Sequence, residues 1–154
     1  MRTLVLGLGN PILGDDGVGN RIAEILQGKI QDPEVTVTET NAVGLNLLDL
    51  FVGYQRAIII DAVLTREGKV GQVHRLTPED FRLSQHLCSP HDVDFASALE
   101  LGKRLGLSLP EEIIIFAVEV AAITTFSESL TPEVEMVVPQ VVQTVLDELA
   151  NAGQ

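Results

Sequence analysis

The chain has little sulfur and few aromatic residues. Its 154 residues include one cysteine, no tryptophan and one tyrosine. The single cysteine, Cys88, excludes an intrachain disulfide and favours a reducing compartment such as the cytoplasm. A disulfide is not needed, because folding a chain of this length removes roughly 70% of its surface from water. We therefore expect one globular domain that spans residues 1–154.

Long hydrophobic runs are also absent. The longest uninterrupted apolar stretch, Ile113–Val118, has six residues, and the apolar run after Met1-Arg2-Thr3 is soon broken by Gly7. A membrane-spanning helix needs about 20 apolar residues, and a signal peptide needs its own longer apolar core. We therefore expect a cytoplasmic protein with neither a membrane span nor a signal peptide.

Basic residues are scarce and unevenly placed. Ten lysines and arginines stand against 22 acidic residues, which gives a formal net charge of −12. The segment from Leu105 to Gln154 holds eight acidic residues and no lysine or arginine. This charge predicts no nucleic-acid partner, because phosphates attract basic surfaces. The acidic segment indicates a solvated face that favours solubility; a patch that attracts a basic partner is the alternative.

Strand and helix patterns alternate along the chain. Short β-branched or apolar runs predict strands over Thr3–Leu8, Glu34–Glu39, Ala57–Ile60, Val70–Leu76 and Ile113–Val118. Apolar residues three or four positions apart predict helices over Gly17–Gln27, Gly44–Phe51 and Val93–Leu105, with Leu105 facing inward, and from Thr131 onward, where Pro139 predicts a kink or a late start. Right-handed crossovers between such strands give an α/β fold, a three-layer α/β/α sandwich with a mostly parallel twisted sheet.

Polar residues follow the predicted strands at three places. Asp16 lies in the glycine-rich segment Gly7–Gly17 after the first strand, Asp61 directly follows the third strand, and His91 lies in Cys88–Asp92. Ligands of parallel sheets bind beyond the carboxyl ends of the strands. Asp16, Asp61 and His91 together offer two oxygen ligands and one nitrogen ligand. This set suits a divalent metal such as nickel or zinc and leaves coordination positions open.

Other roles stay open for these residues. Asp61 is equally consistent with capping the turn after its strand, and one residue of the Asp15-Asp16 pair with capping the next helix. A cap uses only one side chain, so the second aspartate needs another explanation. A phosphate site at the glycine-rich turn is disfavoured, because two aspartates would repel the phosphates. A nucleophilic triad with Cys88 or Ser89 lacks a nucleophile-elbow motif.

These segments, in this order, resemble those of the hydrogenase maturation endopeptidases, nickel-dependent proteases that process the large subunit of nickel-iron hydrogenases. The similarity runs nearly end to end, and its most specific parts are Val5–Gly19, Ile58–Ala62 and Ser89–Asp92, with Leu130–Val134 as a weaker part. The resemblance implies a hydrolase, an endopeptidase of aspartic or metallo type. It also implies that Asp16, Asp61 and His91 are its metal ligands and catalytic residues.

The resemblance further implies a partner and a metal. The partner is the precursor of a nickel-iron hydrogenase large subunit, from which the enzyme removes a C-terminal extension. The nickel arrives with this precursor and serves as a recognition anchor. A non-catalytic metal-sensing or chaperone module that docks on the nickel-loaded subunit is the alternative, and a nucleotide-binding α/β domain is a third. Nothing indicates a coiled coil, so we expect a monomer.

Two further acids lie at predicted strand ends. Where the family commonly has Asp-Gly-Gly after the second strand, this chain has Glu39-Thr40-Asn41. Glu39 keeps a carboxylate there with a longer reach, and the altered loop leaves the substrate preference open. Glu119 lies at the end of the last predicted strand. Facing the cleft is one alternative for it; as an isolated acid it is interpreted as structural.

Overall fold

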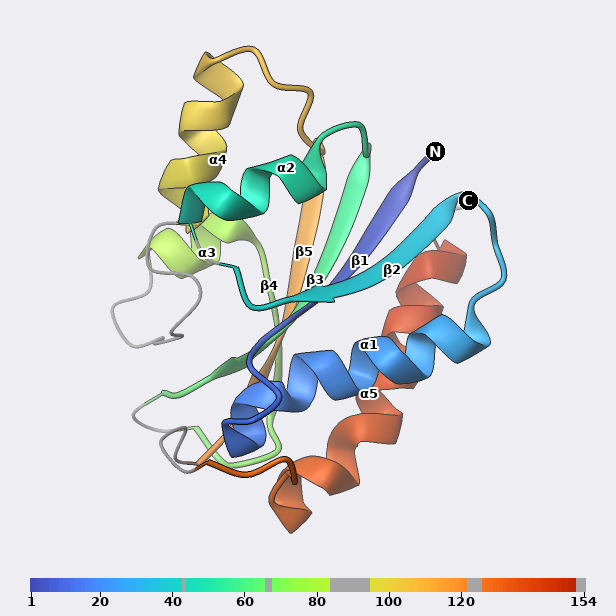
Figure 1. Cartoon of the computed structure of the whole chain (residues 1–154), viewed down its shortest axis with the longest axis vertical. Coiled ribbons are helices and arrows are strands. Elements are labelled where there is room, and N and C mark those ends of the chain that lie inside the picture. Colours follow the sequence, from blue (N-terminus) through green and yellow to red (C-terminus); the bar gives the residue numbers. More distant parts are fainter. Residues whose placement is uncertain (43, 66–67, 84–94, 122–125, 152–154) are drawn as a thin grey trace.

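Five strands form one sheet in the order β2-β1-β3-β5-β4 (Figure 1). The computed structural model describes residues 1–42, 44–65, 68–83, 95–121 and 126–151. The strands are β1 (Thr3–Leu8), β2 (Val35–Thr40), β3 (Arg56–Val63), β4 (Val73–Leu76) and β5 (Glu112–Glu119). The helices are η1 (Gly14–Gly17), α1 (Val18–Lys29), η2 (Gly44–Leu47), α2 (Leu48–Phe51), α3 (Pro78–Leu83), α4 (Phe95–Arg104) and α5 (Pro132–Asn151). In these ranges, no helix is long and apolar enough to cross a membrane.

Parallel pairing dominates the sheet. β1 lies between β2 and β3, and β3 lies between β1 and β5, all in parallel register. β4 is the exception, because it pairs with β5 in the antiparallel direction. Parallel neighbours need a crossover connection, which α1 provides between β1 and β2. The connection through η2 and α2 then takes the chain from β2 past β1 to β3. The predicted α/β fold with a mostly parallel sheet is therefore confirmed.

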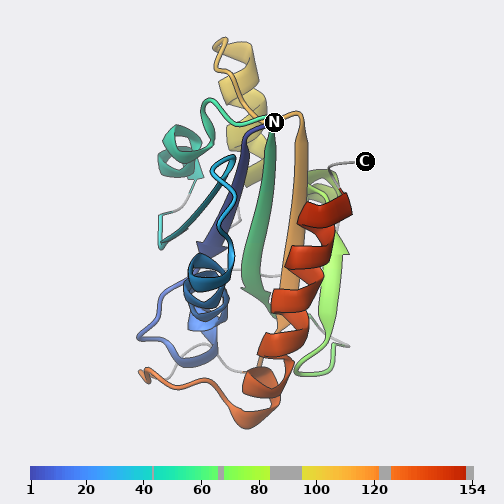
Figure 2. The ribbon, with the colours of Figure 1, turned by 90° about the vertical axis from the view of Figure 1, so that its right-hand side faces the viewer.

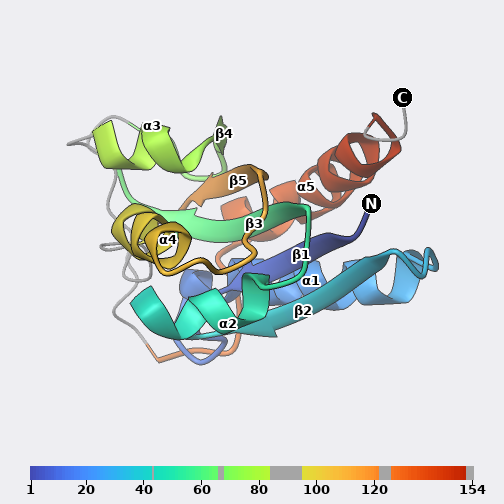
Figure 3. The same cartoon turned by 90° about the horizontal axis from the view of Figure 1, so that it is seen from above.

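Helices cover both faces of the sheet. Successive side chains of a strand point to opposite faces. Ile58 and Ile60 accordingly belong to the core shared with α1 and α5, whereas Ala57 and Ile59 belong to the core shared with α2 and α4. Figure 2 looks onto the face covered by α1 and α5, and Figure 3 shows both sets of helices from above. The predicted three layers are confirmed, and double coverage explains the apolar run of β3.

Several details of the sequence interpretation were wrong. β3 continues to Val63, because its pairing with β5 extends that far, so Asp61 lies inside the strand and does not follow it. Helix α3 occupies a stretch for which the sequence predicted no helix. Leu105 is 68% exposed and lies beyond the end of α4. Helix α5 begins at Pro132 and is continuous through Pro139, so there is no late start.

Helix α1 approaches the sheet through two glycines. A Cβ atom on Gly19 would collide with the carbonyl oxygens of Ile60 and Leu8, and one on Gly7 would collide with the carbonyl oxygen of Gly19. These neighbours are backbone atoms, which cannot rotate aside as a side chain can. The absence of side chains at Gly7 and Gly19 therefore lets the first turn of α1 lie directly on β1 and β3.

Adding a methyl group at this contact is expected to destabilise the fold. Gly19→Ala should lower the free energy of unfolding by about 1–3 kcal/mol, because the added group forces α1 away from the sheet. Gly28, in the same helix, has no heavy atom within 4 Å of its Cβ position. Gly28→Ala is therefore the matched control, and it should be neutral or stabilising by up to about 1 kcal/mol. Urea unfolding checks both variants, and equal stabilities would contradict the close contact.

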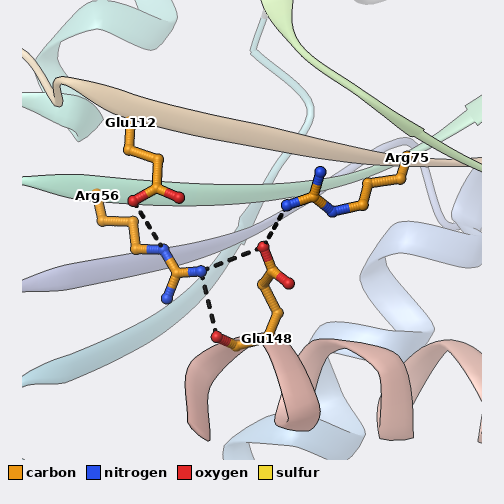
Figure 4. Close-up of polar contacts among 4 residues, drawn as sticks. All are labelled: Arg56, Arg75, Glu112 and Glu148. Atoms are coloured by element: carbon orange, nitrogen blue, oxygen red, sulfur yellow. Dashed lines mark hydrogen bonds and ion pairs between the residues drawn. The ribbon is translucent and has the colours of Figure 1, made fainter. Parts of the chain in front are cut away.

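A buried arginine joins α5 to the amino end of the sheet (Figure 4). The side chain of Arg56, the first residue of β3, is 3% exposed, and its Nε lies 3.5 Å from Oε2 of Glu112. Its Nη2 donates to the backbone carbonyl oxygen of Glu148 at 3.2 Å and lies 3.3 Å from Oε1 of the same residue. Arg75 in β4 also binds this Glu148 oxygen, at 2.7 Å. The network fixes the C-terminal part of α5 against the sheet.

Candidate active site

The carboxyl ends of β1 and β3 bring two of the predicted site residues together. Asp16 lies in η1, within the loop that follows β1, and Asp61 lies near the end of β3. Helix η1 packs against β3. The backbone of Gly19 also lies against the carbonyl group of Ile60, the residue before Asp61. Asp16 and Asp61 are therefore located at the same edge of the sheet.

Asp16 is fully buried, with a relative exposure of 0%. The backbone N–H of Asn10 donates to its Oδ2 at 2.9 Å, and its own N–H donates to the carbonyl oxygen of Leu13 at 3.1 Å. The chain passes so close at Gly9 that a Cβ atom there would collide with the carbonyl oxygen of Asp16. A buried carboxylate is unfavourable unless it is hydrogen-bonded or paired. The loop after β1 supplies such a bond and fixes the position of this carboxylate.

Asp61 is 2% exposed and is a residue of strand β3. Its neighbour across the pairing with β5 is Ala117. Because side chains alternate along a strand, Asp61 shares a face with Ile59 and Val63, which pack with α2 and α4. Its Oδ1 accepts a hydrogen bond from the N–H of Ala62 at 2.8 Å. The alternative that Asp61 caps a turn is therefore wrong, because a strand continues on both sides of it.

The third predicted ligand, His91, lies outside the described residues. The same holds for Cys88 and Ser89, so the predicted grouping of Asp16, Asp61 and His91 stays a prediction. Within the described part of the chain, no group of three or more histidine, cysteine or acidic side chains is arranged to hold a metal ion. Of the three predicted ligands, the described residues therefore place two, Asp16 and Asp61.

Asp15 has a role different from that of Asp16. Its Oδ1 accepts a hydrogen bond from the N–H of Thr131 at 2.7 Å, and its Oδ2 accepts one from the Thr131 hydroxyl at 2.8 Å. Thr131 directly precedes α5, so Asp15 ties the loop after β1 to the start of the last helix. Neither aspartate caps α1, which has no side-chain cap. The capping alternative is wrong, although Asp15 and Asp16 do have separate roles.

A match to a protein-family model identifies the family of this chain. The family model described as hydrogenase maturation protease matches residues 20–148. The chain belongs to the hydrogenase maturation protease family. It is therefore a hydrolase, an endopeptidase of hydrogenase maturation, as the resemblance implied.

Individual members of the family are similar to this chain over almost its whole length. The protease is 29% identical to the hydrogenase 2 maturation protease of Escherichia coli, over 99% of this chain and 93% of that protein. Its structure is similar to that of the hydrogenase maturating endopeptidase HybD of E. coli, with a TM-score of 0.85, 28% identity and coverage of 99% and 94% of the two chains. The structure is also similar to that of HybD of Thermococcus kodakarensis, with a TM-score of 0.71, 28% identity and coverage of 97% of this chain and 99% of that chain.

Glu119 of the protease lies beside the same edge, and the structure gives it several partners. It is buried at the end of β5, directly across from Val63 in β3. The N–H and the hydroxyl of Thr65 donate to its two carboxylate oxygens at 2.8 and 2.7 Å, and Nε2 of His74 lies 3.3 Å from Oε1. Glu119 thereby holds the chain that leaves β3, which agrees with a structural role. Nothing in the sequence marks Thr65 and His74 as partners of Glu119.

Glu39 lies near the end of β2, next to the loop that follows β1. Its register partner in β1 is Gly7. The side-chain Nδ2 of Asn20, in the first turn of α1, donates to Glu39 Oε1 at 3.3 Å. The Glu39 carboxylate is thus connected to the helix that follows η1.

Proposed function

We propose that this protease removes the C-terminal extension from the large-subunit precursor of a nickel-iron hydrogenase that already holds its nickel. The observation that carries the proposal is the pair of buried aspartates, Asp16 and Asp61, at one edge of the sheet in a chain of this family. The name of the E. coli relative, a maturation protease of hydrogenase 2, supports a hydrogenase as the client.

In this proposal the nickel is part of the substrate. The carboxylates of Asp16 and Asp61 and the imidazole of His91 form a set of two oxygen donors and one nitrogen donor, which fits nickel. Such a set binds a free cation weakly, because it leaves several coordination positions unfilled. Productive docking therefore requires that the precursor presents the ion, and cleavage becomes a checkpoint on metal loading.

The chemical step is the hydrolysis of one peptide bond. When present, the nickel polarises the scissile carbonyl group or activates a water molecule. Asp16 or Asp61 accepts the proton of the attacking water, whose oxygen bonds to the carbonyl carbon. The bond between carbon and nitrogen then breaks, and the proton passes to the leaving amine. Both carboxylates accept backbone hydrogen bonds, so they are already oriented before the substrate binds.

The test is a mass measurement of the precursor after incubation with the pure protease. We expect the nickel-loaded precursor to lose a C-terminal peptide and the same precursor without nickel to keep its mass. An unchanged mass for the loaded precursor in a stable complex would favour the non-catalytic docking module. Equal trimming of loaded and nickel-free precursor would contradict the role of nickel as the anchor.

A further inference from the structure

Two exposed apolar side chains lie together on the rim of the site. Leu13, in the loop after β1, forms a parallel bridge with Ser127, in the loop before α5. The N–H of Ser127 donates to the carbonyl oxygen of Ile12 at 2.9 Å, and the N–H of Gly14 donates to the carbonyl oxygen of Ser127 at 2.7 Å. This bridge holds Ile12, which is 48% exposed, next to the segment that begins with Phe126, which is 79% exposed.

An exposed aromatic residue beside the candidate site, such as Phe126, needs an explanation. Isolated apolar side chains on a surface are common. Here, however, backbone hydrogen bonds hold the segment of an aromatic residue next to that of a branched aliphatic one. The aliphatic residue, Ile12, comes four positions before Asp16, whose carboxylate is buried. Aromatic residues dominate the binding energy of protein interfaces. The pair therefore has the composition and the position of a contact for the client.

A cavity of about 320 Å³ lies beside this rim. Its walls include the backbone of Gly14 and Gly17, which flank Asp15 and Asp16 in the sequence. The remaining lining residues include three acids, Glu24, Glu128 and Glu135, and one base, Arg21.

The charge of this cavity is negative. Arg21 is already paired with Glu135, at 3.3 Å, and both side chains are about half exposed. Glu24 and Glu128 have no cation among the lining residues to balance them. A cation that enters the cavity would thus meet two carboxylates that the described part of the protein does not neutralise there.

A second observation points to a ligand with N–H donors. Asn20 lines the cavity and is 4% exposed. Its Nδ2 donates to Glu39, but its Oδ1 is buried and has no hydrogen-bond partner among the described residues. Buried carbonyl oxygens are normally paired. A guanidinium or ammonium group supplies both the donors and the positive charge that this wall lacks.

We propose that this rim is the docking surface for the hydrogenase precursor. An apolar side chain of the client packs on Ile12 and Phe126, and a lysine or arginine side chain of the client enters the cavity beside Asn20 and Glu128. The inference rests on the proposed function and specifies which chemistry of the client is recognised. It also assigns a partner to Glu128, one of the eight acidic residues of the segment from Leu105 onward.

The apolar part is tested by steady-state cleavage of the nickel-loaded precursor by Phe126→Asp. We expect KM to rise at least tenfold while kcat is unchanged, because the substitution lies outside the reacting groups. Leu105→Asp is the matched control: Leu105 is 68% exposed, but it precedes β5 and lies at the opposite end of the sheet. Its kinetics should equal those of the wild type. A Phe126→Asp enzyme with unchanged KM, or with a loss confined to kcat, would overturn the proposal.

The charged part is tested by Glu128→Lys, with Glu111→Lys, directly before β5, as the control. Both residues are exposed, so both variants should fold, and thermal unfolding verifies this. We expect a KM increase of about tenfold for Glu128→Lys only, and a smaller increase at high salt, because screening weakens the repulsion. Equal KM values for the two variants would overturn this part. If the wild type itself leaves the precursor intact, the proposed function fails, whereas normal cleavage by all variants removes only the docking surface.

Discussion

Asp61→Asn is expected to abolish processing of the hydrogenase precursor, with a loss of about 10²- to 10⁴-fold in kcat/KM. Asparagine has nearly the same shape as aspartate, and its side-chain oxygen can still accept the hydrogen bond from the N–H of Ala62. What it loses is the negative charge and one acceptor oxygen. Asp61→Asn therefore removes the proposed metal ligand or base without opening a cavity in β3. Asp16→Asn and His91→Ala are expected to have effects of the same kind.

The mass of the precursor is measured at several times after mixing with each variant. Asp49→Asn serves as the control, because Asp49 is an exposed aspartate of α2 that lies away from the carboxyl ends of the strands. It should process the precursor at the wild-type rate. Thermal unfolding must show that all variants remain folded. Normal processing by Asp16→Asn, Asp61→Asn and His91→Ala would end the proposal that these three residues form the site.

Glu148→Ala is expected to lower the free energy of unfolding by about 3 kcal/mol, which corresponds to a fall of about 10 °C in Tm. Arg56 is buried at the start of β3, and the Glu148 carboxylate is its partner on α5. Removing that carboxylate leaves the buried guanidinium with the 3.5 Å contact to Glu112 and the hydrogen bond to the backbone carbonyl oxygen of residue 148, and it removes the nearest negative charge. A buried charge without sufficient compensation is strongly unfavourable. Arg75 also loses its ion pair with Glu148.

Glu100→Ala is the matched control for Glu148→Ala. Glu100 pairs with Arg104 on the exposed surface of α4 at 3.2 Å, where both side chains are more than half exposed. Exposed pairs contribute between 0 and about 1 kcal/mol. Urea unfolding of the two variants thus compares one glutamate in a buried network with another on a surface. A similar small loss in both variants would show that solvent reaches Arg56 and compensates its charge.

The sequence predicts the layers of this fold because the apolar spacing is strong where both faces are buried. The isoleucines of β3 and β5 and the valines of α5 are examples. The limits of β3 were harder to predict, since its pairing with β5 extends the strand past a charged residue, Asp61. Helix α3 was missed, because its Pro78-Glu79-Asp80 start lacks an apolar stripe.

The site was predictable to the extent that it follows from local position. Asp16 and Asp61 were identified because they come at the carboxyl ends of apolar strands. The hydrogen-bond partners of the nearby acids Asp15 and Glu119 could not be predicted, because they depend on tertiary structure. The contact of Asp15 with Thr131 and that of Glu119 with Thr65 join segments far apart in the chain, and no local pattern reports them.

The bond between Asp15 and Thr131 has a consequence for biosynthesis. The loop that carries Asp16 is made early, but its anchor on Thr131 and its bridge through Ser127 are made near the end of translation. A ribosome-bound chain that ends before β5 also lacks the strand that β3 pairs with beyond Ile60. The nascent polypeptide therefore cannot form the contacts that hold the loop of Asp16 and the end of β3 until almost the whole message has been read.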